Sequence, residues 1–566
     1  MSNGIVRKAG KDWRHDVERR AHLAPPISVS SAIEGLGGVK AFKGIIEPGN
    51  NITVGIVVGI LTLLFFFQRF GTKVVGSAFG PIMFIWFSML IILGAAHIAW
   101  YPHVLHCLSP YYAIKLLATY HNGFWILGAV FLCTTGAEAL YSDLGHCGRK
   151  NIQVSWIYVK IALVINYMGQ GAWLLRHNDK FLGELNPFYE MMPHGFLLIG
   201  VIIATFATII ASQALISGSF TLISEAITLN FWPRVKVKFP TMVRGQIYIP
   251  SVNWLLFTGC VGTMLYFRAS DHMLAAYGFF IAVAMLMTTT LMFGYLRFVR
   301  KWPLVLVLLI MGLFYSVETA FFIANAVKIT QRISFVFFVI GLVVVMYIWF
   351  RARKITNRFL DFVPLTNYAQ ALRDLSDDKE IPKYATHLVY LTKADRNTNV
   401  EKQVIDSIMA RKVKRADIYW FVHVNYTDEP YSMEYRVKEL IDDKVIRVDF
   451  DLGFRVQPRI NMLFKRVLEE LEADHELEFR SKYESIKKGD FHTDICYILT
   501  ERFMSAENEF SLRDDLILDA YFAIKHLALS DREAFGLDLN VTVVEQVPLV
   551  IQQPRDLPLK RSGRPV

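Results

Sequence analysis

The sequence has few charged residues and few cysteines. Only 19% of its 566 residues are Asp, Glu, Lys or Arg, whereas 53% are hydrophobic, an imbalance that is unusual for a soluble protein. The cysteines are scattered along the chain, at Cys107, Cys133, Cys147, Cys260 and Cys496. They form no CxxC pair and no Cys/His spacing suited to zinc, so neither a disulfide framework nor a metal site is expected.

Motifs of several other functions are missing as well. No P-loop, zinc-finger or RNA-recognition motif occurs, so the net charge of +10 is assigned to the cytosolic loops of a membrane protein and not to nucleic acid. Residues 1–20 are basic and polar and lack the apolar core of a signal peptide. Because no catalytic constellation stands out either, we expect no enzymatic activity, no bound cofactor and no nucleic-acid partner.

The first half of the chain is instead a series of apolar runs of a length that crosses a bilayer. The predicted spans are 51–69, 76–99, 121–142, 151–175, 195–217, 251–267, 273–296, 303–323 and 333–350. A shorter candidate at 24–39 brings the total to about ten helices. Two further stretches, 109–119 and 221–231, are predicted to be half-helices of the kind that secondary transporters use.

Charge becomes dense after about residue 350, and no later run reaches spanning length. The predicted organisation is a basic, disordered segment over 1–22, a transmembrane domain over 23–352, a linker over 353–379 and a cytosolic α/β domain over 380–566. Clusters of Lys and Arg fall on alternate turns between the spans, near residues 69–73, 149–150, 234–244, 297–301 and 351–354. The positive-inside rule then predicts a multi-pass protein of the cell membrane, surrounded by lipid, with both termini in the cytosol.

The segment from Thr135 to His146 carries the clearest chemical signal. It places two carboxylates, Glu138 and Asp143, at the inner end of an apolar run, and an ionisable residue at that depth usually marks an ion or proton path. Thr135 and Glu138 are three residues apart and would share one face of a continuous helix. This spacing favours an ion ligand beside a proton acceptor. The alternative for Thr135 is a hydrogen bond to a carbonyl of its own helix.

A site for a dehydrated cation such as potassium needs several oxygen donors. Within the spans these are Ser28, Ser31, Glu34, Thr134, Thr135, Glu138, Tyr141, Asn166, Gln170 and Tyr277. For Tyr277, plain packing explains the residue equally well. Lys160 also lies within a span, where it either extends to the cytosolic surface or pairs with a buried carboxylate such as Glu318.

Four stretches occur in the order in which one transporter family carries them: 27–36 (ISVSSAIEGL), 135–148 (TGAEALYSDLGHCG), 165–171 (INYMGQG) and 275–278 (AAYG). On these matches the chain resembles the Kup/HAK/KT potassium uptake permeases over about residues 26–350, and its tail resembles that of the bacterial branch. The resemblance implies a LeuT-like (APC superfamily) fold of inverted repeats and potassium uptake by symport with protons. It also implies a homodimer and cyclic di-AMP bound to the cytosolic domain.

The resemblance further implies roles for particular residues. The implied ion-binding residues are Ser28, Ser31, Glu34, Thr135 and Tyr277. Among them, Glu34 corresponds to the family's acidic residue on its third helix, and Tyr277 to the tyrosine on its tenth. Glu138 corresponds to the proposed proton-coupling carboxylate on the sixth helix.

The chain departs from the family at its beginning. The family's first helix bears Gly-Asp-x-Gly-Thr-Ser-Pro-Leu-Tyr, which occurs nowhere in this sequence. We therefore expect an N-terminally incomplete fold that lacks the family's first two helices, and a truncated chain that is inactive. The alternative functions are a non-transporting remnant, a regulatory protein that acts through its cytosolic domain, and a transporter of another solute.

In the cytosolic half, the stretches 387–394, 416–424 and 445–451 read as strands. Helical periodicity follows in 400–411, 458–474 and 510–530. Alternation of the two predicts an α/β layer fold.

Overall fold

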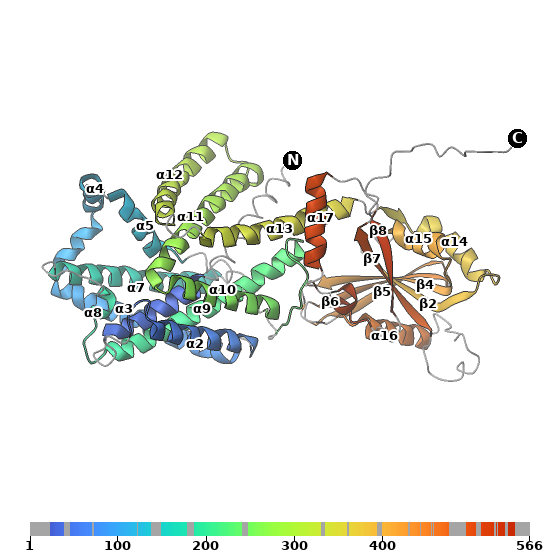
Figure 1. The fold of residues 1–566 in the computed structure, drawn as a ribbon, viewed down its shortest axis with the longest axis horizontal. Helices are drawn as coiled ribbons and strands as arrows, with labels where there is room; N and C mark the ends of the chain where they lie inside the picture. The colour runs from blue at the N-terminus through green and yellow to red at the C-terminus, as the bar shows by residue number, and fades with distance from the viewer. Residues whose placement is uncertain are drawn as a thin grey trace. The chain divides into compact units, whose positions relative to one another are not determined.

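The computed structural model describes residues 23–38, 46–70, 73–120, 123–136, 149–177, 186–239, 247–329, 334–358, 361–392, 399–427, 429, 431–441, 443–453, 456, 458–474, 494–504, 511–525, 528, 530–537 and 542–549. These residues form two compact units, one with most of the chain up to Val344 and the other with most of it from Val345 onward. The first unit is helical, and the second combines helices with a sheet (Figure 1).

Helices account for nearly all of the first unit. After a helix over 23–34, the elements are η1 (Gly35–Gly38), α2 (Asn51–Phe67), η2 (Gln68–Phe70), α3 (Lys73–Trp100), η3 (Pro102–Leu108), α4 (Pro110–Thr119), α5 (Gly123–Thr134), α7 (Arg149–Arg176), α8 (Pro187–Glu190), α9 (Leu197–Thr228), α10 (Pro250–Phe267), α11 (Ser270–Gly294), η4 (Tyr295–Val299), α12 (Leu304–Ile329) and α13 (Ser334–Arg358). The last of these, α13, continues into the second unit.

Five of the described helices contain segments long and apolar enough to cross a membrane: Ala78–Trp100, Lys150–Arg176, Leu197–Ile227, Ala276–Val299 and Leu304–Val327. Their outward faces are apolar, since Ile92 is 67% exposed, Leu309 70% and Val305 77%. Apolar surface of this kind is stable in lipid and unfavourable in water. The first unit is therefore a multi-pass membrane domain, whereas the expected total of about ten spans stays a prediction.

The predicted half-helix over 221–231 is wrong. Helix α9 continues without interruption to Thr228 and is 32 residues long. The helix continues through Gly218 and Ser219, and the Ser219 hydroxyl donates to the Leu215 carbonyl of the same helix at 2.9 Å. The other predicted half-helix, 109–119, corresponds to the short helix α4.

The predicted span over 121–142 is also not a continuous helix. Helix α5 begins at Gly123 and ends at Thr134, only 12 residues later. Its apolar sequence gave no reason to expect an end at this point, because the following Thr and Gly also occur inside membrane helices. The candidate site described below lies at this end of α5.

Helices α5, α11 and α12 pack against one another, and Figure 1 shows α11 and α12 side by side. The ring of Phe131 on α5 lies 4.9 Å from that of Phe321 on α12, measured between centroids. Phe131 also packs with Ile281 and Ala282 of α11. The interior of this three-helix group is thus largely apolar. A buried polar atom inside it that lacks a hydrogen-bond partner is therefore a candidate for a functional role.

Helices α3 and α7 cross closely at two glycines. A Cβ atom on Gly94 would lie 2.5 Å from the Ile165 carbonyl oxygen, and one on Gly169 would lie 2.5 Å from the Gly94 Cα. Small residues of this kind let two membrane helices approach at their backbones. The crossing fixes the part of α7 that carries Asn166 and Tyr167.

The second unit is built on a six-stranded sheet in the order β5-β6-β4-β2-β7-β8. Its strands are β2 (Lys383–Leu391), β4 (Arg415–Thr427), β5 (Met433–Ile441), β6 (Val445–Gly453), β7 (Ile495–Met504) and β8 (Thr542–Leu549). Only β5 runs antiparallel to its neighbour; the other pairs are parallel. A separate antiparallel pair joins β1 (Phe362–Pro364) to β3 (Asn399–Glu401). The three predicted strands correspond to β2, β4 and β6.

Helices cover both faces of this sheet (Figure 1). The helices of this unit are α14 (Thr366–Asp377), α15 (Lys402–Asp406) with η6 (Ser407–Arg411), α16 (Ile460–Ala473), α17 (Leu512–Lys525) and α18 (Asp531–Ala534). Of these, α14, α15 and η6 pack on one face of the sheet and α16 on the other, whereas α17 packs against α13. On β4, Trp420 packs toward Phe464 of α16, whereas its neighbour Phe421 packs on the opposite face with Leu372 of α14. Burial on both faces explains why β4 is a nearly continuous apolar run. The predicted α/β architecture is confirmed.

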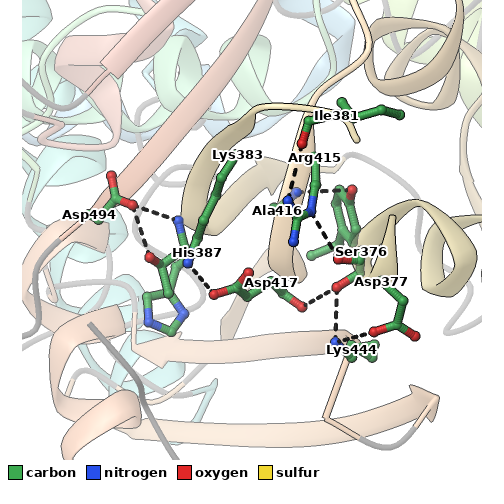
Figure 2. A network of polar contacts seen from close by, with 12 residues as sticks. Ser376, Asp377, Ile381, Lys383, His387, Arg415, Ala416, Asp417, Lys444 and Asp494 are labelled. Atoms are coloured by element: carbon green, nitrogen blue, oxygen red, sulfur yellow. Dashed lines mark hydrogen bonds and ion pairs between the residues drawn. The ribbon is translucent and has the colours of Figure 1, made fainter. Parts of the chain in front are cut away.

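A polar network joins the beginnings of several strands (Figure 2). The Lys383 ammonium pairs with the Asp417 carboxylate. Asp494 accepts hydrogen bonds at 2.9 Å from both the backbone N–H and the hydroxyl of Thr386. Because open parallel sheets bind ligands at the opposite, carboxyl ends of their strands, we assign this network to holding β2, β4 and β7 in register.

Candidate ion-binding site in the membrane domain

The candidate site lies where α5 is interrupted. Thr135 and Gly136 follow the helix in non-helical backbone, and Gly136 has φ +117°, which glycine adopts without strain. The last carbonyl groups of a helix have no partner within the helix and carry the negative end of its dipole. The interruption therefore presents backbone oxygens that favour a cation.

Two of these carbonyl groups are oriented by side chains. The Thr135 hydroxyl donates a hydrogen bond to the Leu132 carbonyl oxygen at 2.8 Å. The Tyr167 hydroxyl on α7 donates to the Cys133 carbonyl oxygen at 3.0 Å. A carbonyl oxygen has two lone pairs, so each hydrogen bond fixes the direction of the group and leaves acceptor capacity for an ion.

Helices α11 and α12 pack beside α5 and carry further oxygen donors. A Cβ atom on Gly278 would lie 3.2 Å from the Leu132 side chain and 2.6 Å from the Asn325 Oδ1 atom, so α11 touches both α5 and Asn325 there. Asn325 is fully buried, and its Nδ2 donates to the Phe321 carbonyl at 2.9 Å. Its Oδ1 has no hydrogen-bond partner among the described residues. Tyr277, directly before Gly278, is partly buried in the same group of helices.

Glu34 lies at a different position, against the first residue of α11. The Ser270 backbone N–H donates to Glu34 Oε1 at 3.2 Å, and the Ser270 hydroxyl donates to Oε2 at 2.6 Å. The Ser30 hydroxyl donates to Oε1 at 2.8 Å. A carboxylate in this place satisfies a free N–H group and complements the positive end of the α11 dipole. Seven residues of helix, about 10 Å, separate Ser270 from Tyr277.

Tyr277 packs in the cluster that contains Phe131 of α5, four residues before Thr135, whereas Glu34 lies at the first residue of α11. That Thr135 and Tyr277 bind one ion stays a prediction. Ser28 and Ser31 are partly buried on the helix over 23–34 that carries Glu34. Glu138 lies outside the described residues. The expectation that Thr135 shares a helix face with Glu138 is wrong, because α5 has ended before Thr135.

The sequence did not point to two residues of this region, Asn325 and Tyr167. Asn325 was not among the oxygen donors, although a single Asn within the apolar run of α12 was a readable signal. Tyr167 belongs to a recognised stretch, yet its contact with the α5 carbonyl depends on the packing of α7. Lys160, for which two positions were open, is exposed, and its Nζ lies 5.2 Å from the centre of the Trp156 ring.

Carbonyl, hydroxyl and amide oxygens of this kind suit a weakly hydrated monovalent cation, whereas divalent cations favour clustered carboxylates. Among the described residues, no group of His, Cys, Asp and Glu side chains is arranged to hold a metal ion. Oxygen donors at an interrupted helix inside a multi-pass bundle define the general class of the protein as an ion transporter.

Comparison with known proteins gives the family. The K+ potassium transporter integral membrane domain matches residues 20–354, and the K+ potassium transporter C-terminal domain matches residues 385–550. Proteins named "Probable potassium transport system protein Kup" from Cytophaga hutchinsonii and Flavobacterium johnsoniae are each 47% identical, with 95% of this chain and 82% of the relative covered. One from Clostridium perfringens is 44% identical with the same coverage. The chain belongs to the K+ potassium transporter family and is not an enzyme.

Proposed function

We propose that this chain takes up potassium across the cell membrane together with a proton. Membership of the potassium transporter family supports potassium as the transported ion. The observation that carries the proposal is the pair of oriented carbonyl oxygens at the end of α5, those of Leu132 and Cys133, together with the Thr135 hydroxyl that follows them. Neutral oxygens replace the hydration shell of potassium at a small cost because this ion is weakly hydrated.

Each candidate residue has a proposed role. Thr135 and Tyr277 are ion ligands, and Asn325 adds an amide oxygen to them. Ser28, Ser31 and Glu34 are proposed as a second group of ion-binding residues on the helix over 23–34, and Glu34 also stabilises the start of α11. Glu138 is the proposed proton-coupling carboxylate; it follows the interruption of α5 in the sequence.

The proposed arrangement is a LeuT-like fold of inverted repeats. In transporters of that kind, ions bind near the midplane at interrupted helices, where half-helix ends and free carbonyl groups coordinate them. The end of α5 at Thr134, with Gly136 at positive φ, supports such an interruption.

Uptake of radioactive rubidium by the full chain in liposomes tests the proposal. Uptake should depend on an inward proton gradient, and potassium should compete with rubidium. Thr135→Val removes the hydroxyl and should raise the rubidium concentration for half-maximal uptake by about tenfold, as for a lost contact to a charged group. Thr258→Val is the matched control, because the Thr258 hydroxyl donates only to carbonyls of its own helix, α10.

A separate variant, Glu138→Gln, tests the coupling of rubidium uptake to protons. Glu138→Gln should remove the effect of the proton gradient while rubidium still competes with potassium for binding. If wild-type protein shows no rubidium uptake at any pH, the transport proposal is wrong. If uptake occurs but ignores the proton gradient, potassium transport stands and symport does not.

The remaining partners are proposals that rest on the family resemblance. They are a homodimer, cyclic di-AMP on the C-terminal domain and the surrounding membrane lipid. Both termini are proposed to face the cytosol, which the loop charges support. Calorimetric titration of the full chain with cyclic di-AMP tests the nucleotide, and a flat titration would remove it.

A further inference from the structure

A second polar position lies within the α11–α12 pair, away from the end of α5. Glu318 is the fifteenth of the 26 residues of α12, and its side chain is only 6% exposed. It belongs to one buried stripe of the helix, formed by Val307, Met311, Glu318 and Asn325 at helical spacing. Its depth in the helix and its burial place a carboxyl group inside the membrane domain, which is rare without a function.

Thr289 of α11 is the hydrogen-bond partner of this carboxyl group. Its hydroxyl donates to Glu318 Oε1 at 2.7 Å. The neighbouring threonines behave differently, since the hydroxyl groups of Thr288 and Thr290 donate to carbonyls of their own helix, Ala284 and Leu286. Thr289 is therefore the member of the Thr288–Thr290 run whose hydroxyl turns to Glu318.

The second oxygen of Glu318 has no hydrogen-bond partner among the described residues. Oε2 is buried and accepts no hydrogen bond from any described residue. No basic side chain among the described residues lies within ion-pair distance of Glu318. Lys160, the partner considered from the sequence, is exposed beside Trp156 instead.

The titratable groups on the elements that pack against α12 are few. In the described part of the chain they are Tyr277 on α11, Cys133 on α5, Tyr315 on α12 itself, Tyr295 and Arg297 on η4, and Arg300 directly after η4. Tyr315 pairs with Thr290, Arg297 with the Trp302 carbonyl and Arg300 with Tyr295, so these groups have other partners. The side chains of Asp271, His272 and Lys328 lie outside those described.

We propose that Glu318, held by Thr289, is a proton-binding site of the membrane domain that is separate from the oxygens at the end of α5. A cation would need several oxygen ligands, and the described residues around Glu318 supply only one hydroxyl besides the carboxyl group. A proton needs only the free oxygen, Oε2, and its binding removes a charge that this surrounding solvates poorly. The proposal rests on proton symport as the proposed function and adds a second carboxyl group to it.

The connection to the ion site runs along α12. Asn325 lies seven residues after Glu318 on the same buried stripe, and its Oδ1 faces α11 at Gly278. Gain or loss of the Glu318 proton changes how tightly α12 holds Thr289 of α11. Protonation therefore alters the packing of α11 and α12, the two helices that carry Tyr277 and Asn325 and that pack against α5.

Infrared difference spectra of the full chain between low and high pH test the site directly. The wild-type protein should show a carbonyl-stretch band of a protonated carboxylic acid that Glu318→Gln loses. Thr289→Val should shift this band because it removes the hydrogen bond to Oε1, whereas Thr290→Val should leave it in place. Spectra of Glu318→Gln that equal those of the wild type would overturn the proposal.

Rubidium uptake over the same pH range tests the link to transport. Glu318→Gln should take up rubidium with a flattened pH dependence, and Thr290→Val should keep the wild-type profile. An unchanged profile in Glu318→Gln, despite loss of the band, would overturn the role in transport. If the wild type takes up no rubidium, the proposed symport fails, while the infrared comparison still decides whether Glu318 binds a proton.

Discussion

The Tyr167 hydroxyl on α7 donates a 3.0 Å hydrogen bond to the carbonyl oxygen of Cys133, one residue before the end of α5. This contact joins a continuous helix to an interrupted one. It directs a carbonyl group that has no partner inside its own helix. The candidate site thus depends on a side chain whose sequence position is remote from the carbonyl that it orients.

Tyr167→Phe tests this contact. Loss of a hydrogen bond worth about 1 kcal/mol should raise the rubidium concentration for half-maximal uptake by roughly fivefold. Tyr158→Phe on the same helix is the control, because the Tyr158 hydroxyl pairs with Ser88 of α3 at 2.8 Å, away from α5. Equal effects of the two substitutions would argue against a special role for the Cys133 carbonyl.

Gly278→Ala tests the close approach of α11 to its neighbours. The new Cβ atom would lie 2.6 Å from Asn325 Oδ1, so we expect destabilisation by about 1–3 kcal/mol and a lower midpoint of thermal unfolding in detergent. Gly312→Ala on α12 is the matched control, since nothing lies within 4 Å of its added Cβ. That change should be neutral or slightly stabilising because alanine favours helix. A Gly278→Ala protein as stable as the wild type would contradict the observed packing.

Lys414→Met tests a buried ion pair in the C-terminal domain. The Lys414 side chain is 2% exposed, lies 2.8 Å from Glu545 of β8 and is 3.1 Å from the Ser407 hydroxyl. Its removal leaves the Glu545 carboxylate without its cation, which should cost about 3–5 kcal/mol. Hydrogen exchange of β8 peptides in the full chain should therefore become faster.

The control for this change is Arg436→Met. Arg436 also pairs with a carboxylate, Asp451 at 2.7 Å, but its side chain is 70% exposed. An exposed pair contributes about 0–1 kcal/mol, so exchange should hardly change. Similar exchange of β8 in both variants would mean that the Lys414–Glu545 pair does not hold the edge strand.

The reactivity of Cys496 on β7 should depend on pH in an unusual way. Burial, assisted by the negative charge of Asp494, raises the pKa of the Cys496 thiol. Less thiolate is then present at a given pH, so the rate of alkylation should reach half its maximum above about pH 8.5, which is the midpoint of an ordinary thiol. Mass spectrometry of the alkylated full chain measures this rate. Asp494→Asn should shift the midpoint to lower pH, and a midpoint at or below about pH 8.5 in the wild type would contradict the raised pKa.

Much of the architecture was predictable because it follows from local composition. The apolar runs indicated a membrane domain, and the strand and helix periods after residue 380 indicated the α/β domain. The interruption of α5 was not predictable, since Thr and Gly are tolerated inside membrane helices. The opposite error occurred in α9, where Ser219 bonds to its own helix and does not break it.

The candidate site was predictable only in part. Motif resemblance selected Thr135, which follows the end of α5, and Tyr277, which packs in the cluster of Phe131 on the same helix. It did not indicate that Glu34 accepts hydrogen bonds from Ser270 at the start of α11. Nor did it select Asn325, whose oxygen becomes notable only when its burial and its lack of a partner are known.

The sequence by itself determined which part of this protein lies in lipid and which forms an α/β layer, because hydropathy and period are properties of neighbouring residues. It also determined the family, through short stretches in a fixed order. Only the tertiary structure decided which oxygens meet at the end of α5 and that Glu318 turns toward Thr289. Such meetings depend on how helices distant in sequence cross, and the crossing is set by the packing of whole faces and not by any single stretch.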